Sequence, residues 1–401
     1  MKYFLFSLLS LVSLSIAAQN PQCIDGRYVD FVFDDVTATK NIKFGEGTEI
    51  AGRFKELFMD IYEPAGDTVA GRPVIVLGFG GSFIAGNRED IDWLCEAYAR
   101  KGYVAVTIDY RLFDGPLFPL PTAIQMQEVV IKAVSDMKGS IRYLRSTVDQ
   151  GNPYNINPNM IIVGGISAGG IMAMHTAALD STDVFDEDLQ VIIDENEGIE
   201  GTTNDLFEYS TEVQGVINFS GGLADANWLD AEDPPFISVH DEFDDTVPYG
   251  GGFASVFGFD IIFMEGSQRC NEVGDSLGIT NELYTIEGST GHVSYFIEAM
   301  STVENINRST DFVSEIVCNV VLSSTDDELK QDVMLYPNPT NGIINWEGTY
   351  DASIYNTVGI EVATAKQANS IDIQHLLAGQ YLVRLQSSEG QISTELIHLI
   401  K

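Results

Sequence analysis

The strongest constraint on the fold of this chain is a glycine-rich turn between an apolar run and a helical pattern. The apolar run at residues 160–164 predicts a buried strand, and residues 171–179 predict a helix. The turn between them (GISAG, residues 165–169) has a glycine two positions before and two positions after Ser167. A sharp strand-to-helix turn strains the serine backbone, and small flanking residues relieve the crowding. The pattern predicts a serine hydroxyl above a sheet edge, at a helix N-terminus that favours developing negative charge.

The chain on either side of this turn alternates apolar runs with amphipathic stretches. The continuous apolar runs at residues 73–77 and 103–108 are typical of parallel strands buried on both faces. The clearest helix covers residues 123–146, where apolar residues recur every three or four positions. This alternation predicts an α/β class with three layers and a mostly parallel sheet. We also predict edge strands at 28–32 and 54–62, further strands at 213–219, 236–240 and 283–286, and helices at 91–101 and 309–322.

The N-terminus and the net charge restrict the compartment and the partners. Residues 1–18 combine a lysine, an apolar stretch and small residues, which is typical of a secretory signal peptide; a membrane anchor is the alternative. The chain carries 21 Lys+Arg against 59 Asp+Glu, a net charge of −38. Such a surface repels phosphate backbones and anionic lipids, so we expect no nucleic-acid partner. No later stretch predicts an integral membrane segment, so we expect an exported protein.

The four cysteines are an even set in an oxidising compartment, where they allow three pairings. No C-x-x-C spacing supports a zinc or redox motif, and we expect neither a metal nor a cofactor. We prefer a pairing of Cys270 with Cys318, both on predicted late helices, and then Cys23 with Cys95. Four free buried thiols are the alternative.

A nucleophilic serine needs a histidine base, and the chain has five histidines. Two of them lie in the C-terminal region, His175 lies two turns into the helix after the serine, and His240 precedes the acidic candidates. Elimination leaves His292, in a polar loop after the last predicted strand. The chain order of such triads is serine, acid, histidine. The acid is therefore expected within residues 241–245, which offer four carboxylates.

Several ordered motifs over residues 54–322 resemble an α/β-hydrolase of the carboxylesterase and esterase/lipase group. They are FMDIYEP at 58–64, DYRL at 109–112, IRYLR at 141–145 and YNINP at 154–158. The resemblance implies the α/β-hydrolase three-layer sandwich. It also implies a secreted carboxylic ester hydrolase in which Ser167 attacks, His292 moves the proton and an acyl-enzyme forms.

The same resemblance extends to the acid and the oxyanion hole. HDEFDDTVP at 240–248 resembles the esterase acid loop, which implies Asp244, with Asp245 as the close competitor. GFGGSF at 78–83 resembles the H-G-G-G/A-F segment, with Phe79 in place of the usual histidine. A glycine-rich nucleotide loop is a weak alternative. The implied oxyanion donors are the backbone amides of Gly81, Ser82 and Ala168.

Two loops at the carboxyl ends of strands, residues 111–121 and 249–263, are candidate pocket walls. The expected substrate-binding residues are Phe83, Phe113, Phe118 and Phe253; satellite core packing is the alternative. We expect the acidic insertion 180–210 to be mostly solvated surface, without EF-hand spacing. The short stretch after Phe219 predicts no large lid. An open cleft would admit esterified polysaccharide, or short-chain or aryl esters.

The sequence pattern of the chain changes after residue 322. A polar linker at 323–331 precedes short β-runs in which LYPNPTNG at 335–342 and LAGQYLV at 377–383 resemble the type IX secretion (Por) sorting domain. The resemblance implies a small all-β sandwich recognised by the type IX machinery; a carbohydrate-binding or adhesive module is the alternative. The expected organisation is signal peptide 1–18, hydrolase domain 19–322, linker 323–331 and sorting domain 332–401.

Two other functions remain open for a secreted or cell-surface chain of this kind. One is a serine peptidase of the same fold, which would hydrolyse peptide amides but not nitrophenyl esters. The other is a catalytically silent hydrolase-like surface protein, in which a fluorophosphonate would not label Ser167.

Overall fold

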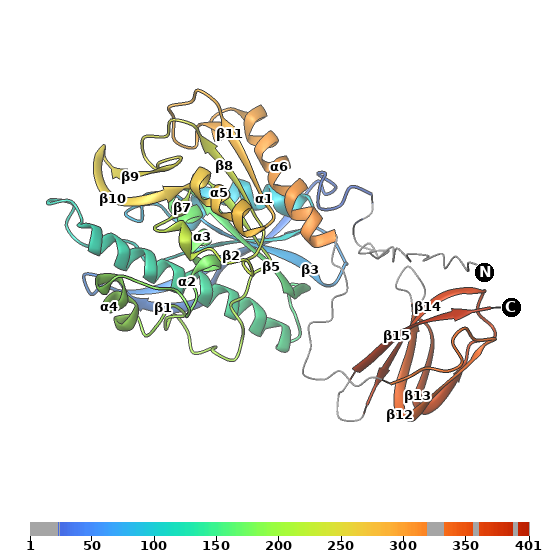
Figure 1. Cartoon of the computed structure of the whole chain (residues 1–401). Helices are drawn as coiled ribbons and strands as arrows, with labels where there is room; N and C mark the ends of the chain where they lie inside the picture. Colours follow the sequence, from blue (N-terminus) through green and yellow to red (C-terminus); the bar gives the residue numbers. More distant parts are fainter. Residues whose placement is uncertain (1–22, 24, 319–332, 356–360, 388–391, 401) are drawn as a thin grey trace, which may run out of the picture. The chain divides into compact units, whose positions relative to one another are not determined.

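The computed structural model describes residues 23, 25–318, 333–355, 361–387 and 392–400 (Figure 1). The chain divides into two compact units, one over Ile24–Val317 and one that contains the C-terminal region from Cys318. The predicted signal peptide 1–18 and linker 323–331 lie outside the described residues. Within the described ranges, no helix combines the length and the apolar character needed to span a bilayer.

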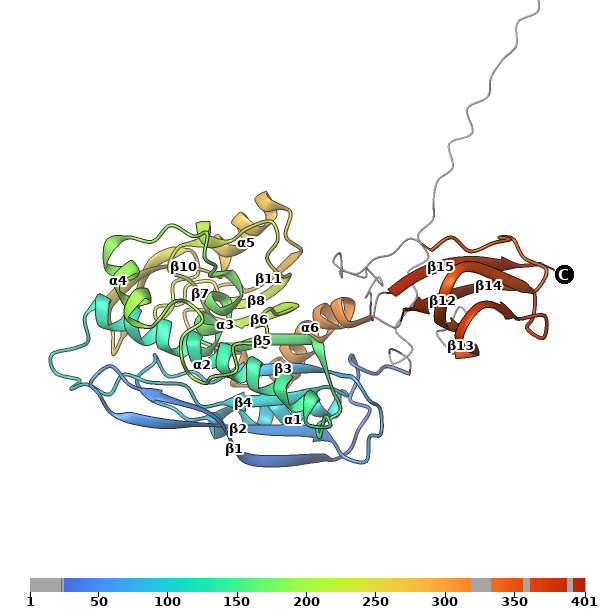
Figure 2. The same ribbon diagram turned by 90° about the horizontal axis from the view of Figure 1, so that it is seen from below.

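The larger unit is built on an eight-stranded sheet, in the order β1-β2-β4-β3-β5-β6-β8-β11 (Figure 2). Pairing is antiparallel from β1 to β4 and parallel across every neighbour from β4 to β11. The α/β class and the mostly parallel sheet predicted from the sequence are confirmed. The strands are β1 (Val36–Thr48), β2 (Phe54–Pro64), β3 (Arg72–Gly78), β4 (Val104–Ile108), β5 (Ile156–Ile166), β6 (Gly215–Phe219), β8 (Phe236–Asp241) and β11 (Asn281–Ile286).

Helices cover the sheet, and the continuous apolar strands β3, β4 and β6 are buried along their whole length. Helices α1 and α6 are joined by a 2.8 Å hydrogen bond between Tyr98 and Ser309. Helix α2 begins at a capping box, in which the Thr122 side chain accepts from the amide of Gln125. The helices are α1 (Asp92–Arg100), α2 (Ala123–Asp149), α3 (Ala168–Ala178), α4 (Glu187–Glu195), α5 (Ser267–Leu277) and α6 (Ala299–Cys318).

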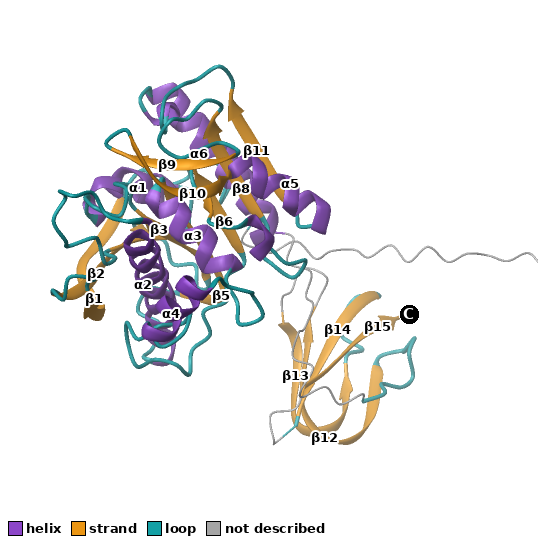
Figure 3. Ribbon diagram, turned by 60° about the vertical axis from the view of Figure 1, so that its left-hand side comes forward, coloured by secondary structure: helices purple, strands orange, loops and turns teal. Residues whose placement is uncertain are grey.

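A second sheet in the larger unit was not predicted. It has three antiparallel strands, β7 (Gly222–Leu223), β10 (Phe259–Gly266) and β9 (Gly251–Val256), and β9 and β10 form a hairpin (Figure 3). From the sequence, this stretch was expected to be a loop with phenylalanines among glycines. Its pairing has a register shift between Asp260 and Ile262, which interrupts the apolar alternation of a simple strand.

Of the two predicted edge strands, residues 54–62 do form a strand, β2, but not at the edge, and residues 28–32 form none. Residues 28–32 are a turn followed by irregular backbone, and Gly26 and Tyr28 adopt positive φ angles of 78° and 74°. The true edge is β1, so β2 lies inside the sheet. Strand β1 was missed because it is rich in polar residues and has register shifts between Thr39 and Ile42 and between Lys43 and Gly45.

The C-terminal unit is an antiparallel four-stranded sheet in the order β13-β12-β14-β15. Its core contains Trp346, Ile354 and Val383. Bridges from Tyr336 to Asn345 and from Thr340 to Leu399 bring the segment before β12 onto this sheet. This sandwich-like arrangement agrees with the predicted all-β class. The strands are β12 (Ile343–Tyr355), β13 (Glu361–Asp372), β14 (Gly379–Gln386) and β15 (Ile392–Leu399).

One disulfide joins Cys23 to Cys318, with the two Cα atoms 5.8 Å apart. Cys95 and Cys270 are free thiols, and both are fully buried. The predicted pairings of Cys270 with Cys318 and of Cys23 with Cys95 were therefore wrong. The reason is that Cys95 and Cys270 lie on the inward faces of α1 and α5, where they act as core residues.

Replacing Cys318 by serine should lower the free energy of unfolding by about 5 kcal/mol, because the crosslink spans a long loop and restricts the unfolded chain. Its two cysteines are separated by 295 residues. Urea unfolding of the wild type and the variant measures the difference. Cys23→Ser is the matched control and should lose the same amount. Thiol titration of the denatured wild type should find Cys95 and Cys270 reactive; finding all four cysteines reactive would contradict the pairing.

Candidate active site

The turn at Ser167 joins β5 directly to α3 and has a strained backbone. Ser167 has φ 56° and ψ −114°, a conformation that L residues rarely adopt. A Cβ at Gly169 would lie 2.0 Å from the carbonyl oxygen of Gly78, and one at Gly165 would lie 2.6 Å from the same atom. Glycine is therefore required at both flanking positions, because the end of β3 packs against the turn.

The three residues predicted as a triad form one hydrogen-bonded chain. The Ser167 hydroxyl lies 2.8 Å from Nε2 of His292, and Nδ1 of His292 lies 2.7 Å from Oδ2 of Asp244. With Nδ1–H donating to the carboxylate, Nε2 is free to accept the serine proton. Ser167 and Asp244 are buried, whereas the His292 side chain retains some exposure. The arrangement can activate a hydroxyl as a nucleophile.

The local fold brings Asp244, and not Asp245, to the imidazole. Oδ1 of Asp244 accepts hydrogen bonds from the amides of Thr246 (2.9 Å) and Val247 (3.0 Å). Burial alone would raise the pKa of Asp244, but hydrogen bonds from His240 and His292 hold it well below its usual value. Asp244 is therefore ionised at neutral pH. The side chain of Asp245 is exposed.

A second histidine, His240, contacts the same carboxylate. It is fully buried at the end of β8, and its Nε2 lies 3.4 Å from Oδ2 of Asp244 and 3.0 Å from the carbonyl oxygen of Val247. Its Nδ1 lies 2.7 Å from the hydroxyl of Ser267. The chain order argued against His240 as the base, and its contact with Asp244 was not predicted. The sequence signal that could have indicated this contact is the position of His240, four residues before Asp244.

The loop that carries His292 is fastened to the end of β8. The carboxylate of Asp241 accepts hydrogen bonds from the amide (3.0 Å) and the hydroxyl of Ser294. The hydroxyl of Tyr295 donates to the carbonyl of Val239 at 3.0 Å. These bonds attach the loop to Val239 and Asp241 of β8, the strand that precedes the acid loop. The imidazole of His292 is therefore held near the end of this strand.

The predicted oxyanion donors lie beside Ser167. Gly81 has φ 127°, and a Cβ there would lie 2.1 Å from the carbonyl oxygen of Ala85. This tight turn precedes Ser82, which together with Ala168 lines the cavity next to Ser167. In the part of the chain that the structure describes, the amides of Ser82 and Ala168 donate to no other protein group. Both are therefore available to a developing oxyanion.

Phe79, which replaces the usual histidine of the loop, is held by aromatic packing. Its ring stacks on that of Tyr110 with centroids 4.2 Å apart, and the Tyr110 hydroxyl donates to the Phe79 carbonyl at 2.8 Å. Both side chains are buried. The stacking and the hydrogen bond order the loop without a histidine.

A cavity of about 80 Å³ opens beside Ser167. Of the four expected substrate-binding residues, only Phe83 lines it. Phe113 is buried in the core with 6% exposure, and Phe118 is 86% exposed. Phe253, on β9, is 56% exposed and packs against Phe263 of the same hairpin. The structure therefore does not bring Phe113, Phe118 or Phe253 to the cavity wall.

His175 lines the same cavity in a neutral state. Its Nδ1–H donates to the carbonyl of Ile171 at 2.8 Å, and its Nε2 accepts from the amide of Ala224 at 3.2 Å. Burial lowers the pKa of His175 to about 4. Both ring nitrogens are thus satisfied, and His175 serves as a wall of the cavity.

Most residues of the acidic insertion 180–210 are exposed, as expected, but the insertion also has a buried face. It contains α4, whose buried residues Leu189, Ile192 and Ile193 pack with Ile131 of α2. Figures 1 and 3 both show α4 beside α2. The prediction overlooked these apolar residues at helical spacing because the surrounding residues are acidic.

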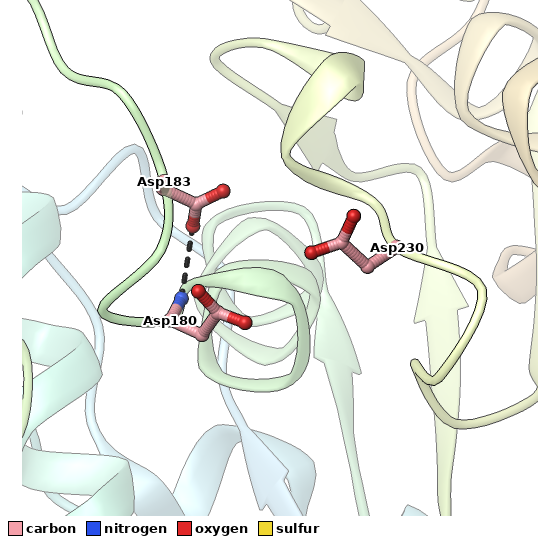
Figure 4. A group of neighbouring side chains, drawn as sticks. All are labelled: Asp180, Asp183 and Asp230. Atoms are coloured by element: carbon pink, nitrogen blue, oxygen red, sulfur yellow. Dashed lines mark hydrogen bonds between the residues drawn. The ribbon is translucent and has the colours of Figure 1, made fainter.

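Three carboxylates near this insertion, those of Asp180, Asp183 and Asp230, lie close together (Figure 4). Their oxygens are within 4.8 Å of one another, and Oδ2 of Asp183 accepts from the amide of Asp180. Asp180 and Asp230 are exposed, and exposed carboxylates of this kind do not by themselves define a metal site. Burial, with repulsion between these groups, raises the pKa of Asp183 to about 6 and that of nearby Asp233 to about 7.

Comparison with known proteins places this site in a class. Solved structures of Thermogutta terrifontis esterase 2 share the fold: the paraoxon-phosphorylated form is 21% identical, with 70% of this chain and 94% of that chain covered and a TM-score of 0.50. The cyclosarin-phosphonylated form is 20% identical, with 71% and 95% covered and a TM-score of 0.49. The larger unit thus has the fold of these α/β structures. No curated protein matches the chain.

Two family matches then define the chain more closely. Residues 59–223 match BD-FAE, and residues 334–400 match the secretion system C-terminal sorting domain. The first segment is therefore similar to BD-FAE domains and the second to secretion sorting domains, which agrees with the hydrolase and sorting-domain resemblances of the sequence motifs. The hydrolase match supports the predicted carboxylic ester hydrolase class, and the sorting domain indicates a secreted or surface protein.

Replacing His240 by alanine should lower kcat for p-nitrophenyl acetate by about 10- to 100-fold with little change in KM. The reason is that Asp244 loses the 3.4 Å contact with the His240 ring, and a polar partner of a charged group is worth about 1.5–3 kcal/mol. His240→Gln keeps a donor near the Nε2 position and should recover much of the loss. Steady-state kinetics of the folded variants measures both. An alanine variant with wild-type kcat would contradict the contact.

The raised pKa of Asp233 predicts a pH-dependent stability effect. Between about pH 4 and pH 7 the folded protein holds a proton that the unfolded chain releases, so this group makes stability fall as pH rises. Asp233→Asn should therefore raise the unfolding temperature at pH 8 more than at pH 4. Thermal unfolding in EDTA measures this, with the exposed neighbour Glu232→Gln as control. Equal shifts for Asp233→Asn at both pH values would refute it.

Proposed function

We propose that this chain is an exported serine carboxylic-ester hydrolase with Ser167, His292 and Asp244 as its catalytic triad. The observation that carries the proposal is the continuous hydrogen-bonded chain from the Ser167 hydroxyl through His292 to Asp244, on a strained turn at the N-terminus of α3. The BD-FAE match over the segment that contains the turn supports the same chemistry.

The reaction follows from this geometry. His292 Nε2 removes the hydroxyl proton as Ser167 attacks the ester carbonyl, and the ionised Asp244 stabilises the resulting imidazolium. The amides of Ser82 and Ala168, with Gly81 shaping the loop or adding a third donor, receive the negative charge on the carbonyl oxygen. The imidazolium then returns its proton to the leaving alcohol. Water activated by the same imidazole releases the acid from Ser167.

The alternatives from the sequence have no support from a specific observation. A serine peptidase of the same fold would use the same triad, but nothing described here recognises a peptide amine. A silent surface protein would not need the His292 ring aligned between a hydroxyl and an ionised carboxylate. On the alcohol side we propose esterified polysaccharide as one substrate, because the His292 side chain is partly exposed.

Export is proposed to use two signals, a Sec signal peptide at residues 1–18 and the sorting domain at 332–401, with the hydrolase domain at 19–322 and a linker at 323–331. The family match at residues 334–400 supports the second signal. The charge and motif pattern of the N-terminus supports the first.

A fluorophosphonate probe should label the wild type at Ser167 and leave Ser167→Ala unlabelled. Asp244→Asn should lower kcat for p-nitrophenyl acetate by about 10⁴-fold, because the imidazole loses the partner that fixes its tautomer. Mass spectrometry and steady-state kinetics measure these outcomes. The matched control is Asp245→Asn, whose carboxylate is exposed, and it should retain wild-type kcat. Equal losses in both aspartate variants would refute the assignment of the acid.

A further inference from the structure

The cavity beside Ser167 lies on the acyl side of the scissile bond. Among the described residues, its wall includes Ser167 and the oxyanion donors Ser82 and Ala168, but not His292. His292 must deliver a proton to the leaving alcohol, so the alcohol has to lie next to the imidazole. When the carbonyl oxygen of the ester lies at the amides of Ser82 and Ala168, the acyl chain is the group that points into the cavity.

The cavity is small. Its volume is about 80 Å³, whereas an engineered cavity that binds benzene measures about 150 Å³. A benzoyl or cinnamoyl ring therefore does not fit without rearrangement of the wall. An aliphatic chain of a few carbons does fit.

The wall of the cavity is apolar and uncharged. No Asp, Glu, Lys or Arg side chain is among the described residues that line it, and His175 there is neutral. An acyl group with its own carboxylate would lose hydration and gain no partner. An aliphatic group gains about 0.8 kcal/mol for each buried methylene.

The acidic insertion forms part of the cavity wall. Leu189 of α4 and Trp228 both line the cavity and belong to one buried cluster with Ile131. The Trp228 ring is packed edge-on between those of His175 (5.9 Å) and Phe185 (5.7 Å). Because these side chains are packed from several elements, the wall cannot yield to a longer chain without loss of core contacts.

From these observations we infer that the enzyme takes short, uncharged aliphatic acyl groups of up to about four carbons, with Leu189 of the inserted helix α4 as the residue that limits chain length. This inference rests on the proposed ester hydrolase function and assigns its acyl specificity. The narrow cavity limits the size of the acyl group of the ester. The cavity does not limit the size of the alcohol group.

The test is a panel of p-nitrophenyl acetate, butyrate, octanoate and benzoate, with p-nitrophenyl hemisuccinate as the charged acyl group. For the wild type, kcat/KM for butyrate should exceed that for octanoate, benzoate and hemisuccinate by at least about tenfold. Leu189→Ala should raise the octanoate-to-butyrate ratio about tenfold. Val191→Ala, an exposed position on the same helix, is the matched control and should leave the ratio unchanged.

A second variant acts in the opposite direction and does not depend on Leu189→Ala folding. Val130→Phe fills the cavity from α2 and should lower butyrate hydrolysis relative to acetate about tenfold. Wild-type preference for octanoate or benzoate, or an unchanged ratio in both variants, would overturn the inference while Ser167 labelling by a fluorophosphonate preserves the proposed function. Absence of both labelling and ester hydrolysis would overturn the two together.

Discussion

The close approach of three glycines is the contact on which the rest of the site depends. Gly165 and Gly169 flank Ser167, and a Cβ on either would meet the carbonyl of Gly78 at the end of β3. A strained serine costs about 1–3 kcal/mol, and the surrounding packing has to hold it in place. The amide of Ser167 donates to the carbonyl of Phe219 at 2.7 Å, so the turn is fixed from β3 on one side and β6 on the other.

The other two residues of the proposed triad come from the carboxyl ends of neighbouring parallel strands. Asp244 follows β8 and His292 follows β11, and these two strands pair in register from Phe236 to Asp241. Ligand and catalytic groups gather at this edge in open α/β sheets because the loops there meet in space. Asp241 then ties the His292 loop back to β8 through Ser294. The geometry of the triad is thus a consequence of strand order and of one buried carboxylate.

The parts of the site that could be predicted are those with a local signature. The turn at Ser167 has its own five-residue pattern. His292 could be identified by elimination because the chain has few histidines. The contact of His240 with Asp244 depends on the conformation of the loop between them, and the pairing of Cys23 with Cys318 depends on a fold that closes over 295 residues. Neither contact has a recognisable pattern in the neighbouring sequence. Helix α4 does have one, the helical spacing of Leu189, Ile192 and Ile193, but acidic residues on its other face dominated the composition.

Helix α4 also shows how a hydrolase sheet can acquire specificity without changes at its catalytic centre. The triad and the oxyanion loop are held by β3, β5, β8 and β11, whereas the cavity is closed by the α4 insertion and the β9–β10 hairpin. These two elements line the proposed acyl cavity and make none of the hydrogen bonds of the proposed triad. Substitutions in α4 can therefore alter chain length preference while the strained turn stays intact. In this molecule, backbone packing fixes the position of the serine, and side-chain packing shapes the cavity beside it.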